Sequence, residues 1–203
     1  MITIINIGLS NIKSITRGFA TQGYKVSVSR DPEEVRRADS LVLPGVGAYP
    51  KAMEILQKRG LHNAICEHAA RGKPLIGICL GMQLLFTDSS EHHHTGGLGL
   101  IPGHVVQFPR DRPVPHMGWN SLAQTGKNPL FKDIPDPSDF YFVHSFYAEP
   151  EERRHVIGYS DHCGPFAAAV QNGNIYGTQF HPEKSQTHGL TLLRNFARLT
   201  ETD

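Results

Sequence analysis

The sequence has few cysteines, no long apolar run and almost no net charge. Its three cysteines, at positions 66, 79 and 163, form no Cys-x-x-Cys pair, so they indicate neither a disulfide framework nor a zinc site. No apolar stretch approaches the ~20 residues of a membrane span. The first residues, MITIINIG, also lack the basic region of a signal peptide. We therefore expect a cytoplasmic protein with reduced cysteines.

Lysine and arginine together number 20, and aspartate and glutamate number 19. This balance excludes a generally basic surface for nucleic acid. The sequence contains neither a Walker loop nor a G-x-G-x-x-G motif, so nucleotide binding by this chain is not indicated. It also contains no internal repeat, low-complexity tract or long linker. At 203 residues we expect one domain spanning residues 1–203.

The first half of the chain alternates strand and helix patterns. Residues 2–7 form a near-continuous apolar run, which is typical of a strand buried on both faces. Strand–helix alternation of this kind predicts a parallel sheet covered by helices on both sides. The predicted strands lie at residues 2–7, 25–29, 41–43 and 74–78, and the predicted helices begin near residues 11, 32, 51 and 61.

After residue 87 short strand patterns are separated by proline, glycine and aspartate. Asn172-Gly173 lies between the last two and predicts a hairpin. A final helix carries an apolar face that includes Leu192, Phe196 and Leu199. The predicted fold is a single α/β domain with a mixed, mostly parallel sheet flanked by helices. The late strands are predicted at residues 104–108, 140–143, 155–159, 166–171 and 174–178.

The strongest chemical signal is a cysteine between two glycines, at residues 77–81 (GICLG), after a predicted strand and before an apolar helical run at 82–86. This is the G-x-nucleophile-x-G elbow with cysteine in the serine position. A sharp strand-to-helix turn requires glycines on both sides of Cys79. It places the thiol at a helix N-terminus, where the dipole favours the thiolate. The amide of Leu80 would then point at an oxyanion beside the sulfur.

A thiol nucleophile needs a base and usually a group that orients the base. Residues 177–183 (GTQFHPE) supply both after a predicted strand. His181 and Glu183 are two apart, so in an extended chain they project to the same side. They lie near the carboxyl end of a strand, where open α/β sheets bind ligands. The alternative is a surface histidine beside a solvated glutamate.

Several blocks together resemble the class I (triad) glutamine amidotransferases. More narrowly, they are similar to the family of glutaminase subunits of imidazole glycerol phosphate synthases. The general blocks are residues 44–47 (PGVG), 77–81 with Gln83, and 179–185 (QFHPEKS); the narrower ones are 97–103 (GLGLIPG), 115–120 (PHMGWN) and 141–147 (YFVHSFY). The resemblance covers essentially the whole chain.

This resemblance implies a flavodoxin-like architecture and a role for particular residues. It implies Cys79 as the nucleophile, His181 as general base and then acid, and Glu183 as the group that orients His181. The further residues that it implies are Gly45, Val46, Gly47 and Leu80 for the oxyanion hole; Gln83, Glu91, Ser145 and Phe146 for glutamine; and Asn11, His116, Trp119 and Lys184 for the face toward a partner.

The implied substrate is L-glutamine, which this chemistry hydrolyses to glutamate and ammonia without a metal or organic cofactor. Ammonia released into water would be wasted and mostly protonated, so a partner should take it directly. The resemblance implies a heterodimer with a separate (β/α)8-barrel cyclase. That cyclase converts the ammonia and a phosphoribulosyl-formimino ribonucleotide to imidazole glycerol phosphate and an aminoimidazole carboxamide ribonucleotide, in histidine biosynthesis. A ~250-residue barrel does not fit within this chain.

Three alternatives stay open at this point. Another amidotransferase subunit, such as one serving pyridoxal phosphate synthesis, would share the triad but not residues 115–120. A glutamine-binding or regulatory module would carry a thiol that stalls after acylation, and a simple peptidase would share the elbow. Residues 91–94 (EHHH) form a histidine cluster. Adjacent loop side chains rarely converge on one ion, so no metal site is predicted there.

Overall fold

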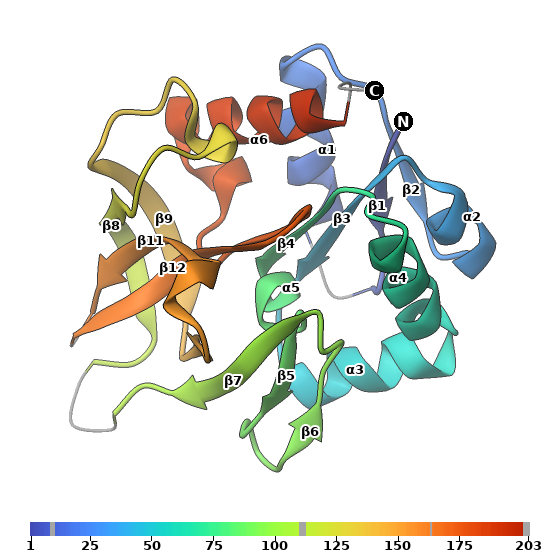
Figure 1. The fold of residues 1–203 in the computed structure, drawn as a ribbon, viewed down its shortest axis with the longest axis horizontal. Helices are drawn as coiled ribbons and strands as arrows, with labels where there is room; N and C mark the ends of the chain where they lie inside the picture. The colour runs from blue at the N-terminus through green and yellow to red at the C-terminus, as the bar shows by residue number, and fades with distance from the viewer. Residues whose placement is uncertain (9–10, 110–112, 163, 201–203) are drawn as a thin grey trace.

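Four strands of the N-terminal half and one late strand build a parallel sheet (Figure 1). The computed structural model describes residues 1–8, 11–109, 113–162 and 164–200. The parallel strands lie in the order β2-β1-β3-β4-β13, and every neighbouring pair among them is parallel. Their bounds are β1 (Ile2–Ile5), β2 (Val26–Ser29), β3 (Ser40–Gly45), β4 (Leu75–Cys79) and β13 (Ile175–Thr178).

Side chains of these strands alternate between two apolar cores, one on each face of the sheet. Ile4 and Val42 pack in the core that α1 and α6 cover. Ile5 and Leu43 pack in the core that α2, α3 and α4 cover (Figure 1). All residues of β1 and β3 are buried, which explains the continuous apolar runs. The helices are α1 (Ile12–Thr21), α2 (Pro32–Arg37), α3 (Tyr49–Lys58), α4 (Leu61–Ala70) and α6 (Gln186–Leu199).

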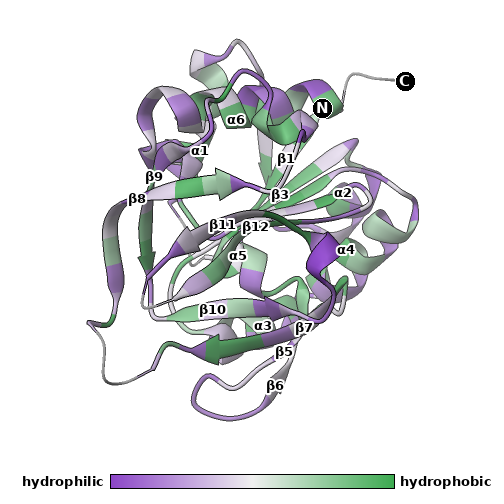
Figure 2. Ribbon diagram, turned by 60° about the vertical axis from the view of Figure 1, so that its left-hand side comes forward, coloured by the Kyte–Doolittle hydropathy of each residue, from purple (hydrophilic) through white to green (hydrophobic). Residues whose placement is uncertain are grey.

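Hydropathy follows this layering. Figure 2 shows mostly apolar residues along β1 and β3, whereas α6 carries both apolar and polar residues, as expected of a helix with one face in the core. Helix α2 begins as its sequence predicts, since the Asp31 carboxylate accepts a hydrogen bond from the Glu33 N–H at 2.8 Å. Asn11 occupies the N-cap of α1 without a side-chain hydrogen bond. Ser10, which precedes Asn11 and is also a residue type that favours helix caps, lies outside the described residues.

The second half of the sheet is largely antiparallel. It continues from β13 through β12 (Pro165–Asn172), β10 (Phe146–Pro150), β7 (Ile101–Gln107), β5 (Phe86–Ser89) and β6 (Thr95–Gly96), with β5 and β7 parallel. A side branch holds β11 (Val156–Asp161), β8 (His116–Gln124) and β9 (Ser138–His144). The predicted hairpin at Asn172-Gly173 is confirmed, because Asn172 pairs with Ile175 across it. The mixed sheet flanked by helices confirms the predicted α/β fold class. The prediction that the sheet is mostly parallel is wrong, because five of the described strand pairs are parallel and seven are antiparallel.

Two local predictions differ from the structure. The helix predicted over residues 82–86 is wrong: α5 (Leu80–Gln83) holds four residues, and Phe86 already begins β5. Strands β5, β6, β8 and β10 were not predicted. Short 3₁₀ turns also occur at Pro129–Phe131, Arg153–His155 and Pro182–Lys184. Among the helices in the described ranges, none has the length and apolar character to cross a membrane.

Candidate active site

Cys79 ends β4 at a sharp turn into α5. Its φ of 54° and ψ of −112° are unusual for a residue with a side chain, and such conformations cost about 1–3 kcal/mol. The flanking glycines allow the close approach. A Cβ on Gly77 would lie 2.5 Å from the Gly81 carbonyl oxygen, and a Cβ on Gly81 would overlap the Leu43 carbonyl oxygen. The predicted turn is therefore present, and the rest of the fold holds its strain.

The helix after Cys79 is shorter than the sequence suggests. Because α5 has only four residues, its dipole is small, and the free N–H groups of its first turn are the main local donors. The predicted oxyanion residues gather here. Gly45 pairs with Cys79 across β3 and β4, and Val46, Gly47 and Leu80 line the cavity beside the sulfur.

His181 and Glu183 form a buried pair. Nδ1 of His181 lies 2.9 Å from Oε1 of Glu183, and the two side chains are only 3% and 1% exposed. The predicted cause of this pairing is wrong, since residues 182–184 form a 3₁₀ turn and not an extended strand. The turn itself brings the carboxylate back to the ring. An ionised carboxylate only accepts hydrogen bonds, so Nδ1 carries a proton.

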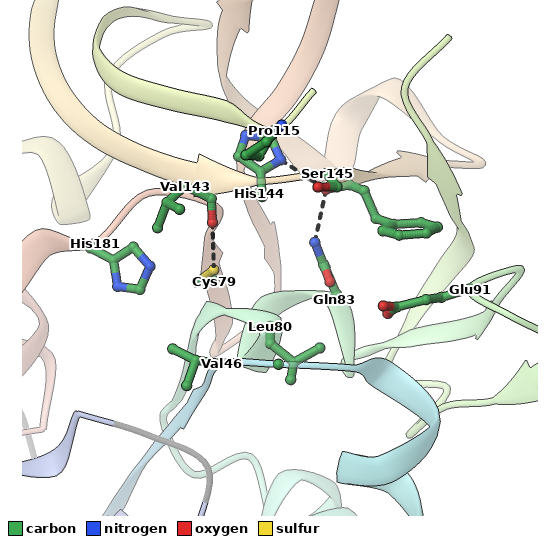
Figure 3. A pocket seen from close by; sticks show the side chains of 12 residues that line it. Val46, Cys79, Leu80, Gln83, Glu91, Pro115, Val143, His144, Ser145 and His181 are labelled. Atoms are coloured by element: carbon green, nitrogen blue, oxygen red, sulfur yellow. Dashed lines mark hydrogen bonds between the residues drawn. The ribbon is translucent and has the colours of Figure 1, made fainter. Parts of the chain in front are cut away.

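The second nitrogen of His181 is available for chemistry. Nε2 is buried and makes no hydrogen bond of normal geometry within the described ranges. Figure 3 shows the ring pointing into the cavity beside Cys79. Burial alone would lower the pKa of His181, but the Cys79 sulfur and the Glu183 carboxylate together raise that pKa to about 10. The site therefore favours an imidazolium next to the sulfur.

A cavity of about 430 Å³ opens over Cys79. All four side chains predicted to contact glutamine, Gln83, Glu91, Ser145 and Phe146, line this cavity. Glu91 is fixed in place because its Oε2 accepts a hydrogen bond from the Tyr49 N–H at 2.8 Å. The lining residues are Val46, Gly47, Cys79, Leu80, Gln83, Glu91, Pro115, Val143, His144, Ser145, Phe146 and His181.

The sequence alone did not indicate Gln179, Val143 and His144 as part of this site. The buried Gln179 directs Nε2 toward the Cys79 sulfur at 3.8 Å, and its Oε1 accepts from Nε2 of Gln83 at 3.0 Å. The Val143 carbonyl lies 3.8 Å from the same sulfur (Figure 3). Gln179 stands directly before the Phe-His-Pro-Glu segment, and this position was the one available signal for it.

The four residues predicted to face a partner divide into two groups. Trp119 is 49% exposed, and its ring meets that of Tyr141 edge to face at 6.2 Å. Nζ of Lys184 lies 5.5 Å above the same Tyr141 ring, and Asn11 is also exposed. His116 differs, because its side chain is only 5% exposed. The structure therefore does not place the His116 ring on the surface as that prediction requires.

The histidine cluster at residues 92–94 lies on the surface, and one of its rings contacts a carboxylate that a further histidine shares. His94 and His104 both contact the carboxylate of Asp88, at 3.2 and 2.8 Å. The Asp88 contact raises the pKa of His104. Across the ranges that the structure describes, no group of three or more His, Cys, Asp or Glu residues is arranged to hold a metal ion.

A cysteine at a strand-to-helix turn, next to a His–Glu pair at the carboxyl edge of a parallel sheet, is typical of α/β enzymes with a thiol nucleophile. Comparison with known sequences narrows this class. The family described as "Glutamine amidotransferase class-I" matches residues 3–199. The chain therefore belongs to the class-I glutamine amidotransferase family.

Curated relatives extend over nearly the whole chain. A protein of Moorella thermoacetica is 48% identical over 198 residues, which cover 98% of this chain and 94% of the relative. A protein of Neisseria meningitidis serogroup B is 45% identical, with 95% and 97% covered. Both are named "Imidazole glycerol phosphate synthase subunit HisH".

Solved structures agree with the fold. One described as "Crystal structure of glutamine amidotransferase" has a TM-score of 0.79 at 17% identity, with 99% of each chain covered. The structure of PurLQS from Thermotoga maritima has a TM-score of 0.78 at 19% identity, with 98% of this chain and 97% of that chain covered. At these identities the similarity shows a common architecture.

Proposed function

We propose that this chain hydrolyses L-glutamine to glutamate and ammonia and serves as the glutaminase subunit of an imidazole glycerol phosphate synthase. One observation carries the chemistry: the buried His181–Glu183 pair leaves the second ring nitrogen of His181 directed at the Cys79 side of the cavity. The names of relatives 45–48% identical over nearly the full length support the assignment to this synthase. The proposed glutamine amidotransferase domain spans residues 1–203.

In the first half-reaction the Cys79 sulfur attacks the carboxamide carbon of the glutamine side chain. A carbon–sulfur bond forms, and the carbonyl oxygen becomes an oxyanion. His181 holds the former thiol proton on Nε2 and passes it to the departing nitrogen. The carbon–nitrogen bond then breaks, ammonia leaves and a γ-glutamyl thioester remains. Glu183 stabilises the imidazolium and fixes the tautomer through Nδ1.

The developing oxyanion needs donors beside the sulfur. The Leu80 N–H and the backbone of the loop at Gly45, Val46 and Gly47 are the proposed donors. Support comes from Gly47, whose φ of +97° a residue with a side chain rarely adopts. Loss of a single oxyanion donor typically lowers kcat by about 10²–10³-fold.

In the second half-reaction water replaces ammonia. Nε2 of His181 takes a proton from the water, whose oxygen attacks the thioester carbon. The carbon–sulfur bond breaks, glutamate leaves and the thiolate–imidazolium pair is restored. Gln83, Glu91, Ser145 and Phe146 are the proposed contacts to glutamine.

The proposed partner is a barrel cyclase that receives ammonia directly and makes imidazole glycerol phosphate and the aminoimidazole carboxamide ribonucleotide, in histidine biosynthesis. Trp119, Lys184 and Asn11 are the proposed interface side chains, and their exposure supports this role. Exposed aromatic rings such as that of Trp119 are typical of protein interfaces. The described cysteines, Cys66 and Cys79, are free, which is consistent with a cytoplasmic location.

Trapping of the acyl-enzyme tests the chemistry. We expect glutamine, mixed with the purified chain and quenched with acid, to leave a γ-glutamyl adduct on Cys79 that mass spectrometry detects, together with free glutamate. An electrophilic glutamine analogue should label the same residue. An adduct without glutamate release would favour a binding module whose thiol stalls. The absence of both the adduct and free glutamate, even with the barrel cyclase and its nucleotide ligand present, would contradict the proposed function.

A further inference from the structure

Two buried histidines connect strand β8 to the wall of the cavity through a hydrogen bond. The mechanism above does not use them. His116 of β8 and His144 of β9 are paired residues in the antiparallel ladder. Nδ1 of His116 lies 3.0 Å from Nε2 of His144. The two side chains are 5% and 6% exposed, and His144 lines the cavity. A buried histidine pair of this kind must be hydrogen-bonded in a defined order.

The carbonyl at one end determines that order. Nδ1 of His144 lies 2.8 Å from the Phe146 carbonyl oxygen. A carbonyl only accepts, so this nitrogen carries the proton of a neutral ring. Nε2 of His144 is then an acceptor, and Nδ1 of His116 must donate to it.

The hydrogen bonds at the other end of this series, at His116, are equally defined. With its proton on Nδ1, His116 accepts at Nε2, where Nδ2 of Asn120 lies 3.1 Å away. The same amide also donates to the Asp161 carbonyl oxygen at 2.8 Å. The resulting chain runs in one direction, from Asn120 through His116 and His144 to the Phe146 carbonyl. We call these four residues the histidine relay.

This order of hydrogen bonds requires both histidine rings to be neutral, and the surroundings of the rings favour the neutral form. Burial lowers the pKa of His116 to about 4 and that of His144 to about 3. The His116 ring stacks on Phe142, with ring centres 4.9 Å apart, and on His162, with ring centres 4.2 Å apart. These contacts fix the ring plane, so the direction of each hydrogen bond is fixed as well.

The relay ends on an atom that also positions a predicted substrate contact. The Phe146 carbonyl accepts a second hydrogen bond, from Nε2 of Gln83 at 2.9 Å. Figure 3 shows both hydrogen bonds converging on this backbone segment of the cavity wall. At the opposite end, Asn120 directly follows the exposed Trp119 on β8.

We propose that His116 and His144 are positioning residues of the glutamine site. Through the histidine relay they hold the Phe146 carbonyl, and with it Gln83, in the geometry that receives glutamine. They also connect this wall to the strand that bears Trp119. The kinetic consequence rests on the proposed function, whereas the order of the hydrogen bonds does not.

Nuclear magnetic resonance of the full chain with ¹⁵N-labelled histidine tests that order without any substrate. Both rings should be neutral at pH 7 with the proton on Nδ1, which gives a protonated-type Nδ1 signal and an unprotonated-type Nε2 signal. Substitution of Asn120 by alanine assigns the His116 signals, because it removes the donor to Nε2. A proton on Nε2 of either ring, or an imidazolium, would overturn the relay.

Steady-state kinetics test the consequence for glutamine. His116→Phe keeps an aromatic ring but leaves Nε2 of His144 without its donor and removes one of the two acceptors of the Asn120 amide, so we expect KM for glutamine to rise about 5–20-fold while kcat changes less than about 3-fold. His116→Asn retains a donor near the position of Nδ1, so its KM should lie closer to that of the unsubstituted chain.

The matched control is His68→Phe. His68 is also buried and bonds the Pro74 carbonyl through Nε2, but it lies outside the cavity, so its KM should not change. A KM for His116→Phe within 2-fold of the unsubstituted value, or an equal rise in His68→Phe, would overturn the positioning role. If the unsubstituted chain does not hydrolyse glutamine even with the barrel cyclase and its nucleotide ligand, the proposed function fails, and the nitrogen signals alone decide the relay.

Discussion

The parallel and antiparallel parts of this sheet are built on different principles. The parallel strands β1 and β3 are buried on both faces, and β4 ends in a strained cysteine between two glycines. The antiparallel strands bury polar rings, such as His116 and His144, and expose large apolar side chains, such as Trp119. The parallel part thus supplies a rigid base for the proposed nucleophile. The antiparallel part supplies the proposed substrate wall and partner face.

The parallel and antiparallel parts meet at His181, the proposed general base. The His181 N–H donates to the Tyr141 carbonyl of β9 at 2.9 Å. The Ser185 hydroxyl donates to the His181 carbonyl at 2.7 Å and accepts from the Tyr141 N–H at 3.0 Å. The backbone of His181 is therefore held by the strand whose Tyr141 ring contacts Trp119 and Lys184.

Removal of the thiol has the largest expected effect. Cys79→Ala should lower glutamine hydrolysis by at least about 10⁴-fold, since nucleophile and base act as a unit. The free energy of unfolding should not fall, because alanine fits where a small side chain already does. Glutamate release and urea unfolding measure the two quantities, with Cys66→Ala as the control. Retention of more than 1% of the activity would contradict the role of Cys79.

The buried carboxylate should matter next. Glu183→Gln keeps the size of the side chain but removes the charge that stabilises the His181 imidazolium. The pKa of His181 should therefore fall below its value of about 10, and kcat/KM should fall about 10²–10⁴-fold. Titration by nuclear magnetic resonance and steady-state kinetics measure these changes.

Glu54→Gln is the control for this change, since Glu54 pairs only with surface lysines of α3 among the contacts described. An unchanged pKa of His181 in Glu183→Gln would show that the carboxylate does not govern the base.

Adding a methyl group at a glycine should have different effects on stability in the parallel and the antiparallel part. Gly81→Ala forces apart β3 and the turn after β4, because its Cβ overlaps the Leu43 carbonyl oxygen. We expect a loss of about 1–3 kcal/mol in the free energy of unfolding. Gly126→Ala, in a turn of the antiparallel part with nothing within 4 Å of the added Cβ, should change it by less than about 0.5 kcal/mol. Equal losses in urea unfolding would remove this distinction.

The partner face should respond without affecting the chemistry of the isolated chain. Trp119→Ala removes an exposed aromatic ring. Its dissociation constant for the barrel cyclase should rise about 10–30-fold, as for an aromatic side chain at an interface centre. Glutamine hydrolysis by the isolated chain should stay within 2-fold. Calorimetric titration with the cyclase measures the affinity, and an unchanged value would place the interface elsewhere.

Acid should lower the free energy of unfolding through buried histidines in both the parallel and the antiparallel part of the fold. Burial lowers the pKa of His68 and of His116 to about 4, below the ~6.5 of an unfolded chain. The unfolded state then binds more protons, so stability present above pH 6.5 is lost as pH falls toward 4. The raised pKa of His181 acts above pH 6.5 and does not oppose this loss.

Urea unfolding between pH 7 and 4 checks this prediction. The free energy of unfolding should fall by about 1–3 kcal/mol for each such histidine, and His68→Phe should flatten the profile. A stability that is independent of pH in this range would contradict the neutral state of the buried rings.

The sequence predicted the parallel part well because its rules are local. Burial on both faces makes β1 and β3 mostly apolar, with Thr3 and Ser40 as the buried polar residues, and the turn at Cys79 needs glycines at fixed spacing. Strand β8 was not predicted, since it buries His116 and exposes Met117 and Trp119, the reverse of the usual pattern.

The candidate site, too, was predictable from the sequence only where its residues lie in local motifs. Its main residues lie in compact motifs, but Gln179 contacts a sulfur 100 positions away, and His144 contacts His116 across 28 positions. Contacts of this kind follow from the pairing of strands and have no local signal. The pairing of His181 with Glu183 was predicted, but the 3₁₀ turn that produces it was not.

Glutamate release by the purified chain, alone and with the barrel cyclase and its nucleotide ligand, tests the central claim most directly. The account predicts strong activation by the liganded partner, complete dependence on Cys79, and weaker activation in Trp119→Ala at subsaturating cyclase. Full activity without the cyclase would retain a glutaminase but contradict the proposed synthase. No turnover dependent on Cys79 under either condition would contradict the account as a whole.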